Sequence, residues 1–193
     1  MAKWAQLGTF YPFARFHYDI HSPENEPYKQ PEPYASIIRR TMFDRYQYSR
    51  ELYTCLFIMS KYGGSCFSPL FYSFPNDTKL YEQYESSFIF ANAIKVTPNL
   101  LENSQSIPAY FPYAKGKWVS LVNTREILSG NTSFTLDTTG YSTPAHLMPG
   151  KIISFQNNSD ASINNIHQLI NGSITVLVNP DDNDFAEGSI FLD

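Results

Sequence analysis

Two patterns of apolar residues divide the chain near residue 65. Between residues 37 and 59 there is no Pro or Gly, and large apolar residues recur at steps near three and four, with one longer step. This spacing predicts one amphipathic helix that ends at Gly63-Gly64, because glycine readily adopts the backbone conformation that closes a helix. The apolar positions are Ile38, Met42, Tyr46, Leu52, Leu56 and Met59.

After residue 65 the chain consists of short apolar segments separated by Gly, Pro and Asn. Many short strands at close spacing favour an antiparallel β-sandwich, and no fixed period indicates a solenoid or a propeller. We predict turns at Pro75-Asn76-Asp77 and at residues 179–182. The predicted strands are residues 66–74, 88–91, 94–97, 107–110, 117–120, 133–136, 145–148, 152–156, 173–178 and 189–192.

The segment before the helix is predicted to be an irregular, partly extended loop. Four prolines, at positions 23, 27, 31 and 33, disfavour regular structure there. We therefore expect a mixed α and β fold, with a helical N-terminal part followed by an antiparallel β-sandwich. Of the two tryptophans, Trp4 is expected to pack under the helix and Trp118 inside the sandwich.

Composition narrows the classes of function. With 193 residues, of which 42% are hydrophobic, the chain can bury a sizeable core. A charged fraction of 17% and a net charge of -4 argue against a nucleic-acid-binding surface, which needs clustered Lys and Arg. The longest apolar run is too short to span a bilayer. Aromatic residues make up 16% of the chain, and most are expected to fill the core, although such rings also stack on sugars.

The cysteines and the glycosylation motifs are evidence on the cellular compartment of the protein. Cys55 and Cys66 make no disulfide framework, and we expect two buried free thiols, since one lies in a helical pattern and the other in a strand-like one. Asn-x-Ser/Thr sequons begin at Asn76, Asn131, Asn157 and Asn171. In a chain this rich in Asn and Ser, the sequons support a secretory location only weakly.

The most specific motif lies between Gly8 and Tyr28. The run Phe10-Tyr11-Pro12-Phe13, followed by Arg15 and His17 and then by Glu26-Pro27-Tyr28, resembles a signature of family 31 glycoside hydrolases of the α-glucosidase type. The resemblance implies that this segment follows the last strand of a (β/α)8 barrel and brings a histidine to the sugar pocket. It also implies that both catalytic carboxylates lie upstream, so we expect no catalytic residue here and no activity from this chain alone.

Further motifs resemble the same family in the same order. The resemblance implies three parts: residues 1–65 as the end of the barrel with its exit helix, 66–156 as a proximal β-sandwich, and 157–193 as the start of a distal β domain. The matching runs are Arg45-Tyr46, Leu52-Tyr53-Thr54, Pro69-Leu70-Phe71, Phe74-Pro75-Asn76-Asp77, Phe88-Ile89-Phe90, Val96-Thr97-Pro98, Tyr110-Phe111-Pro112, Gly116-Lys117-Trp118 and residues 188–193. Arg50 departs from the family, which commonly has Pro there.

His17 is the candidate substrate-binding residue. The resemblance implies that its imidazole bonds a hydroxyl of the bound sugar, and a neutral imidazole can both donate and accept a hydrogen bond. The alternative is a histidine bonded to the backbone of a packed turn. Arg15 is expected to hold the loop through a salt bridge rather than to touch sugar.

Retaining glycosidases need two carboxylates about 5–5.5 Å apart. The acids of the N-terminal loop are expected to be solvated instead, with Glu26 capping or anchoring the loop, because nothing here could hold a catalytic pair rigidly. These acids are Asp19, Glu24, Glu26 and Glu32.

No cofactor is expected. His17 and His21 are the only pair in the sequence that we consider as candidate metal ligands. On a helix these two side chains would share a face, but Pro12 and Pro23 flank the stretch and disfavour a helix. Without a second cluster of ligands, we predict no metal site.

Two functions from different classes remain open. In the first, the chain is the C-terminal part of an enzyme that hydrolyses terminal α-linked glucose, with an α-glucoside or oligosaccharide and the barrel portion as partners, and with neither nucleic acid nor membrane involved. The resemblance then implies the secretory pathway: endoplasmic reticulum, lysosome or extracellular space. In the second, the chain is a non-catalytic β-sandwich module that binds carbohydrate or protein.

Overall fold

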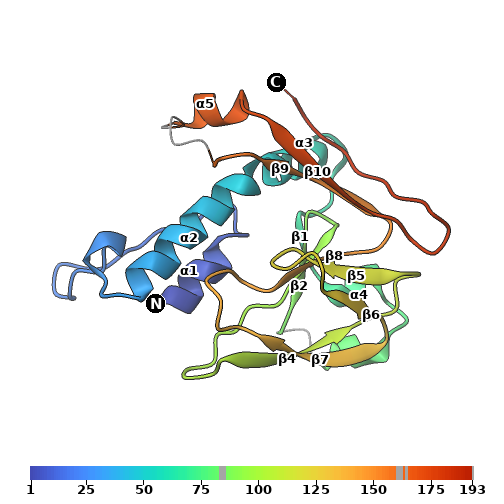
Figure 1. Ribbon diagram of the computed structural model, residues 1–193, viewed down its shortest axis with the longest axis horizontal. Helices are drawn as coiled ribbons and strands as arrows, with labels where there is room; N and C mark the ends of the chain where they lie inside the picture. The colour runs from blue at the N-terminus through green and yellow to red at the C-terminus, as the bar shows by residue number, and fades with distance from the viewer. Residues whose placement is uncertain (83–85, 160–162, 164, 193) are drawn as a thin grey trace.

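The computed structural model describes residues 1–82, 86–159, 163 and 165–192. Helices dominate the first third and antiparallel strands the remainder (Figure 1), which confirms the mixed fold class expected from the sequence. Among the described residues, no helix is long and apolar enough to cross a membrane. The helices are α1 (Ala2–Gly8), η1 (Pro27–Lys29), α2 (Tyr34–Gln47), α3 (Ser49–Tyr62), α4 (Leu70–Ser73), η2 (Thr78–Tyr81) and α5 (Ile166–Ile170), where η denotes a 3-10 helix.

The strands form three antiparallel groups. The largest sheet has the order β1-β2-β3-β8-β5-β6, and β4 pairs with β7 while β9 pairs with β10. In Figure 1 the β4–β7 pair lies at the end opposite the β9–β10 pair, with the six-stranded sheet between them. The strands are β1 (Phe67–Pro69), β2 (Phe88–Phe90), β3 (Ile94–Val96), β4 (Ser106–Phe111), β5 (Lys117–Ser120), β6 (Ile127–Ser129), β7 (Thr132–Asp137), β8 (Ala145–Leu147), β9 (Lys151–Gln156) and β10 (Ile174–Asn179).

Each face of the six-stranded sheet covers its own apolar core. Successive side chains of a strand point to opposite faces, so Ile89 joins one core and Phe90 the other. The first core lies against β4 and β7 and is centred on Trp118, which is fully buried and donates its indole N–H to the Pro112 carbonyl at 3.1 Å. The second core lies against the junction of α2 and α3 and against β9. Burial of Trp118 is as predicted, whereas Trp4 is 63% exposed, contrary to prediction.

The predicted single helix is wrong at Tyr48, where α2 ends and α3 begins. The Tyr48 ring is buried among Phe10, Phe90 and Phe155, with ring centroids 4.9, 6.5 and 5.2 Å away. Beside it the Ser49 hydroxyl donates to the Tyr46 carbonyl at 2.7 Å, a local bond that competes with regular helical structure. The end of the helix is as predicted, because Gly63 closes it with a φ of 78°.

Several strand predictions need correction. Residues 66–74 form a strand only over β1, whose last residue, Pro69, is also the N-cap of α4; proline lacks the N–H that a longer ladder would require. Residues 189–192 form no strand: Phe191 instead stacks on Phe57 at 3.9 Å, and its N–H donates to the Thr54 hydroxyl. Strand β6 and helix α5 were not predicted.

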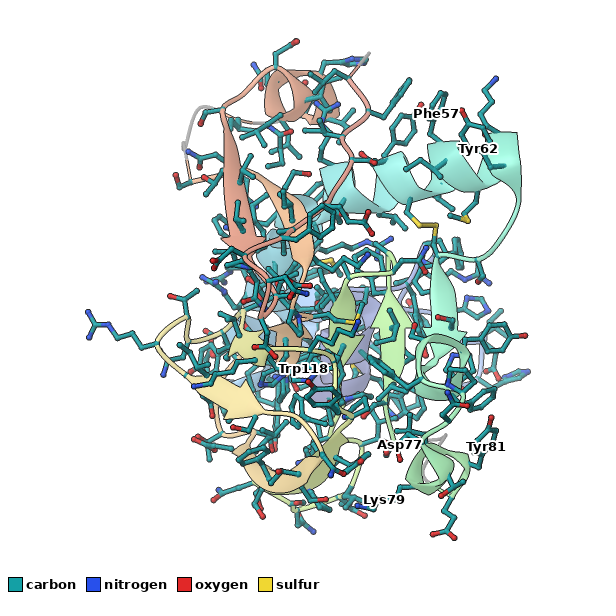
Figure 2. The ribbon with its side chains drawn as sticks, turned by 90° about the vertical axis from the view of Figure 1, so that its right-hand side faces the viewer. Phe57, Tyr62, Asp77, Lys79, Tyr81 and Trp118 are labelled. Atoms are coloured by element: carbon teal, nitrogen blue, oxygen red, sulfur yellow. A yellow bond between two sulfur atoms is a disulfide. The ribbon has the colours of Figure 1, made fainter. Side chains whose placement is uncertain are left out.

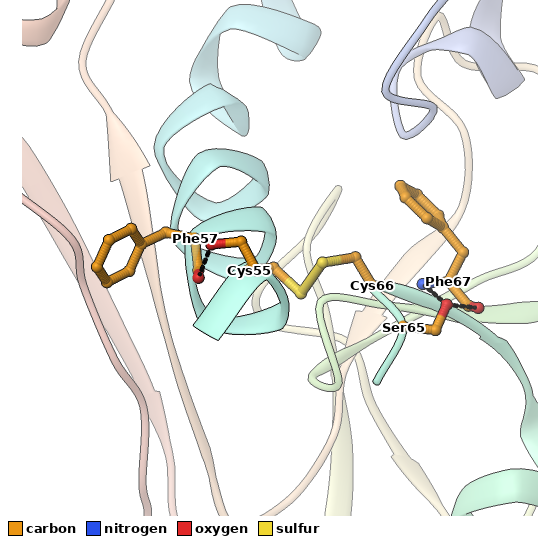
Figure 3. The surroundings of a disulfide bond; sticks show 6 residues. Cys55, Phe57, Ser65, Cys66 and Phe67 are labelled. Carbon is orange, nitrogen blue, oxygen red and sulfur yellow. Dashed lines mark hydrogen bonds between the residues drawn. A yellow bond between two sulfur atoms is a disulfide. The ribbon is translucent and has the colours of Figure 1, made fainter. Parts of the chain in front are cut away.

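The prediction of free thiols is also wrong. Cys55 of α3 and Cys66, just before β1, form a disulfide, with their Cα atoms 5.8 Å apart (Figure 3). The chain turns back at Gly63-Gly64, where positive φ angles of 78° and 103° suit glycine, and this reversal brings the helix and the strand together. The disulfide therefore fastens the helical part of the chain to the six-stranded sheet.

Removing this disulfide is expected to lower the free energy of unfolding by about 3 kcal/mol. A cross-link between residues 11 positions apart restricts the unfolded chain, and a short closed loop of this kind is worth roughly that amount. Urea denaturation of the double variant Cys55→Ser/Cys66→Ser beside the parent chain measures the difference. Adding a reductant should destabilise the parent and leave the double variant unchanged; equal curves for the two proteins would contradict the prediction.

Helix α3 also holds the C-terminal segment through two buried charged residues. The Arg50 guanidinium donates to the Gln156 side chain, to the Ile170 carbonyl and to the Phe191 carbonyl, at 3.3, 2.8 and 3.3 Å. Glu51 accepts from both the N–H and the hydroxyl of Ser154, at 3.0 and 3.1 Å, and burial raises its pKa. The guanidinium of Arg50 therefore has three acceptors, two of which, the Ile170 and Phe191 carbonyls, lie in the chain after β9.

The core between the six-stranded sheet and β4–β7 contains two basic side chains. Lys95 of β3 and His146 of β8 are cross-strand partners, both almost fully buried, and both contact the ring of Phe111. The Lys95 ammonium donates to the hydroxyls of Ser87 and Thr97 at 3.1 and 2.6 Å. Burial lowers the pKa of Lys95 to about 7, and burial together with the neighbouring ammonium lowers the pKa of His146 to about 3.

Candidate functional site

The candidate site lies where the loop between α1 and α2 folds back over both helices. After α1 the chain contains no regular element until η1, so residues 9–26 follow an irregular path. The loop predicted around Pro23, Pro27, Pro31 and Pro33 is irregular except for η1. His17 lies in the middle of this path. The loop is therefore held by side-chain contacts rather than by a helix or a strand.

Arg45 of α2 fastens the start of the loop. Its guanidinium donates to the Gly8 carbonyl at 2.7 Å, to the Pro12 carbonyl at 2.9 Å and to the Tyr11 carbonyl. Partial burial lowers the pKa of Arg45, although arginine remains charged at any ordinary pH. Three carbonyls bound by one planar donor fix the turn that leads into the residues around His17.

A cavity of about 270 Å³ lies beneath this loop. Its walls come from α1, from the loop and from α2, and His17 lies at its edge with an exposed side chain. Asn25 donates to the main-chain carbonyl of His17 at 3.0 Å, which ties the histidine backbone to the far side of the loop. Within the described residues the imidazole makes no hydrogen bond, so both ring nitrogens are available. The lining residues are Met1, Trp4, Ala5, Gly8, Ala14, Arg15, Phe16, His17, Asn25, Thr41, Met42 and Arg45.

Each acid of the loop has a local partner. Asp19 accepts from the His21 N–H at 2.8 Å and from the Ser22 hydroxyl at 3.0 Å, and these bonds lower its pKa. Glu24 pairs with Lys29, and Glu32 accepts from the N–H of Ser36 near the start of α2 at 3.3 Å. These three carboxylates stabilise turns and a helix end.

Glu26 fits the anchoring role expected for it. The Tyr18 hydroxyl donates to its carboxylate at 2.9 Å, which joins the residue after His17 to the segment that leads into η1. Hydrogen bonds from its own backbone N–H and from Tyr18 lower the pKa of Glu26. Glu26 is therefore an ionised acceptor that closes the loop next to Asn25.

Two other expectations for the loop are resolved by the geometry. Arg15 makes no salt bridge to any described residue; its guanidinium lies over the Phe13 ring at 5.8 Å. His17 and His21 lie in irregular chain rather than on a helix. Across the ranges that the structure covers, no three His, Cys, Asp or Glu side chains gather in a way that could hold a metal ion.

Sequence reasoning proposed His17 as a candidate and missed the residues that hold its surroundings. Asn25 carries no motif signal of its own, and its bond to the His17 carbonyl depends on the path of the loop. Arg45 did carry a signal, since Arg45-Tyr46 is part of the resemblance, but the pattern gave no indication of its three carbonyl partners.

Two family models match the chain in succession. The model described as "Glycosyl hydrolases family 31 TIM-barrel domain" matches residues 1–55, and "Glycosyl hydrolase family 31 C-terminal domain" matches residues 63–153. The boundary between the two falls at the end of α3 and the disulfide.

Individual relatives match the same region. A probable α-glucosidase of Oryza sativa subsp. japonica is 30% identical over all of this chain and 21% of its own length. The lysosomal α-glucosidase of Mus musculus is 33% identical over 62% of this chain and 12% of its own length. The crystal structure of a glucosidase II alpha subunit has the same fold, with a TM-score of 0.86 at 24% identity, covering 98% of this chain and 20% of that chain. The chain thus spans about a fifth or less of the proteins that it matches.

Proposed function

Because the chain belongs to glycosyl hydrolase family 31, we propose that it is the C-terminal portion of a retaining α-glucosidase-type enzyme that acts on α-linked glucose. In this proposal residues 1–65 complete the barrel and supply its exit helix, residues 66–156 form the proximal sandwich, and residues 157–193 begin a distal β domain. The observation that carries the proposal is the succession of a barrel-domain match and a C-terminal-domain match within one chain.

His17 is the residue of this chain that binds substrate in the proposed enzyme. Its exposed imidazole lies at the edge of the cavity, and its backbone is held by Asn25. A neutral imidazole can donate to one sugar hydroxyl oxygen and accept from another hydroxyl. Such a bond contributes to catalysis to the extent that it strengthens as the ring distorts toward the transition state.

In this proposal the catalytic carboxylates belong to the part of the barrel that lies outside these 193 residues. Two carboxyl groups must be held about 5–5.5 Å apart for retention, one as nucleophile and one as acid and base. The loop acids Asp19, Glu24, Glu26 and Glu32 are each engaged in local contacts on an irregular segment. Their roles in turns and a helix end support a structural function.

The proposed location is the secretory pathway. A disulfide forms and persists in an oxidising compartment, and the bond between Cys55 and Cys66 fits such a place. The lysosomal relative in Mus musculus supports the same assignment.

A chimaera tests the proposal. The chain replaces the corresponding C-terminal segment of the Oryza sativa relative, and turnover of a chromogenic α-glucoside is compared with that of the isolated chain. We expect the chimaera to hydrolyse the substrate and the isolated chain to give only the background rate. Turnover by the isolated chain that disappears in Asp19→Asn or Glu26→Gln would overturn the proposal.

In the chimaera, His17→Ala is expected to lower kcat/KM by ~30-fold. Loss of a hydrogen bond to a sugar hydroxyl in the transition state removes about 2 kcal/mol. The matched control is His21→Ala, an exposed histidine on the same loop that does not line the cavity. Steady-state kinetics of both variants measure the effect. Equal losses in the two variants would mean that the loop as a whole, and not the His17 imidazole, matters.

A further inference from the structure

Four sequons meet the sequence requirement for N-glycosylation, and the fold separates them into two pairs. An N-glycan is attached through Nδ2 of asparagine and needs an exposed site on a loop or turn. Asn76, Asn131, Asn157 and Asn171 are all exposed. They differ in what the side-chain amide does in the folded chain.

In one pair a hydrogen of the amide nitrogen already takes part in a bond within the fold. Nδ2 of Asn157 donates to the Ser173 hydroxyl at 3.1 Å, while its Oδ1 accepts from the N–H and the hydroxyl of Ser159. Nδ2 of Asn171 donates to the His167 carbonyl at 2.9 Å, at the end of α5. A glycan at either position would crowd a contact that the fold already makes.

In the other pair the amide nitrogen is free. Among the described residues, the Asn76 side chain has no hydrogen-bond partner, and it lies in the turn between α4 and η2. Asn131 is exposed in the connection between β6 and β7 and has a φ of 56°. Its Oδ1 accepts from the Tyr110 hydroxyl at 3.0 Å, and no described group binds its Nδ2.

The two free sequons lie next to each other. The Tyr110 hydroxyl contacts both Asp77 at 2.6 Å and Asn131 at 3.0 Å, so the two turns meet at this phenol. Figure 2 shows Asp77 and Lys79 at the end of the molecule opposite Phe57 and Tyr62 of α3. Glycans attached here would leave the sandwich on the side away from α3.

We propose that Asn76 and Asn131 are N-glycan acceptors. In the transfer, Nδ2 forms a bond to C1 of the first sugar and loses one proton, while the C1–O bond to a lipid-linked pyrophosphate donor breaks and the lipid pyrophosphate leaves. The attached nitrogen keeps one N–H, and Oδ1 keeps its lone pairs. The contact between Oδ1 of Asn131 and the Tyr110 hydroxyl does not involve the nitrogen that is modified.

The proposal rests on the secretory location argued above and is independent of any catalytic role for His17. The disulfide provides a separate reason for that location, since oxidised cysteines and N-glycans arise in the same compartment. Giving the chain a heterologous secretion leader makes the test independent of where the natural protein resides.

The experiment expresses the full chain behind such a leader in a eukaryotic host and treats both medium and cell lysate with an amide-cleaving glycosidase. Thr78→Ala and Ser133→Ala each destroy one sequon while keeping the asparagine, and Ser159→Ala is the matched control on a sequon whose amide is engaged. Mobility on a denaturing gel and peptide mapping by mass spectrometry give the occupied sites.

We expect the secreted parent to shift by two glycan-sized steps on digestion. Each of Thr78→Ala and Ser133→Ala should lose one step, the double variant should lose both, and Ser159→Ala should match the parent. The proposal is overturned by a parent that shows no shift in either fraction, or by a shift that persists unchanged in the double variant. Because the lysate is also digested, a variant that fails to fold still reports its occupancy.

Discussion

Trp118→Ala is expected to lower the free energy of unfolding by about 4 kcal/mol, because deleting a fully buried indole removes apolar contact and leaves a cavity that the core cannot close. Trp118 has no exposed surface, and its ring lies against Phe74 and Phe111, with centroids 6.1 and 5.6 Å away. Its N–H also satisfies the Pro112 carbonyl, which the alanine variant leaves without a donor. Urea denaturation followed by circular dichroism measures the loss.

Trp4 provides the matched control, since it is the other tryptophan and is 63% exposed. Trp4→Ala should change the free energy of unfolding by no more than about 0.5 kcal/mol. Trp118→Phe retains most of the ring but loses the N–H, and a cost of about 1–2 kcal/mol is expected for it. If Trp118→Ala unfolds at the same urea concentration as Trp4→Ala, this side of the sandwich is not the core described above.

Lys95→Met is expected to stabilise the chain at pH 7 and to remove a pH dependence. The pKa of Lys95 falls from 10.5 to about 7 in the folded chain. Between these values the unfolded chain binds the proton that the folded chain lacks, so the stability of the parent rises as the pH increases from about 7. Near and below pH 7 the folded chain carries most of the penalty of a buried ammonium without a carboxylate partner among the described residues.

A pKa lowered from 10.5 to about 7 corresponds to at most about 5 kcal/mol, and loss of the bonds to Ser87 and Thr97 reduces the effect. Denaturation curves between pH 7 and 9.5 measure the slope. The His146 pKa of about 3 places that group's contribution below this range. The control is Lys117→Met, an exposed lysine on β5, which should leave the slope as in the parent. A parent with a flat profile over this range would rule out the buried ammonium.

Local signals in the sequence predicted the features that depend on local chemistry. Gly63 ends the helix as expected because its positive φ is a property of the residue itself. The break at Tyr48 was missed because it depends on the packing of that ring against Phe90 and Phe155, which are distant in sequence. Likewise, the disulfide requires a Cα separation that spacing alone does not supply.

The buried lysine shows a different limit. In the run Ile94-Lys95-Val96 the alternation of apolar and polar residues is typical of a strand with one solvent-exposed face, and this pattern would place the lysine on that face. The β4–β7 pair covers that face, so Lys95 is fully buried. The alternation correctly indicates which residues share a face of the strand, but it does not indicate which other strands cover that face.

In the candidate site, too, some features follow from the local sequence and others from the three-dimensional fold. His17 followed from a motif, whereas the contacts that fix its surroundings, from Asn25 and Arg45, follow from the course of the backbone. Sequence pattern therefore located the candidate residue, whereas the contacts that support it are found only in three dimensions.

The sulfur bridge between Cys55 and Cys66 also determines how the molecule would respond to proteolysis. Tyr62 is 84% exposed and is followed by Gly63-Gly64, an accessible stretch enclosed by the bridge. A protease that cuts there would leave both products joined, migrating as one band until thiol is added and as two bands afterwards.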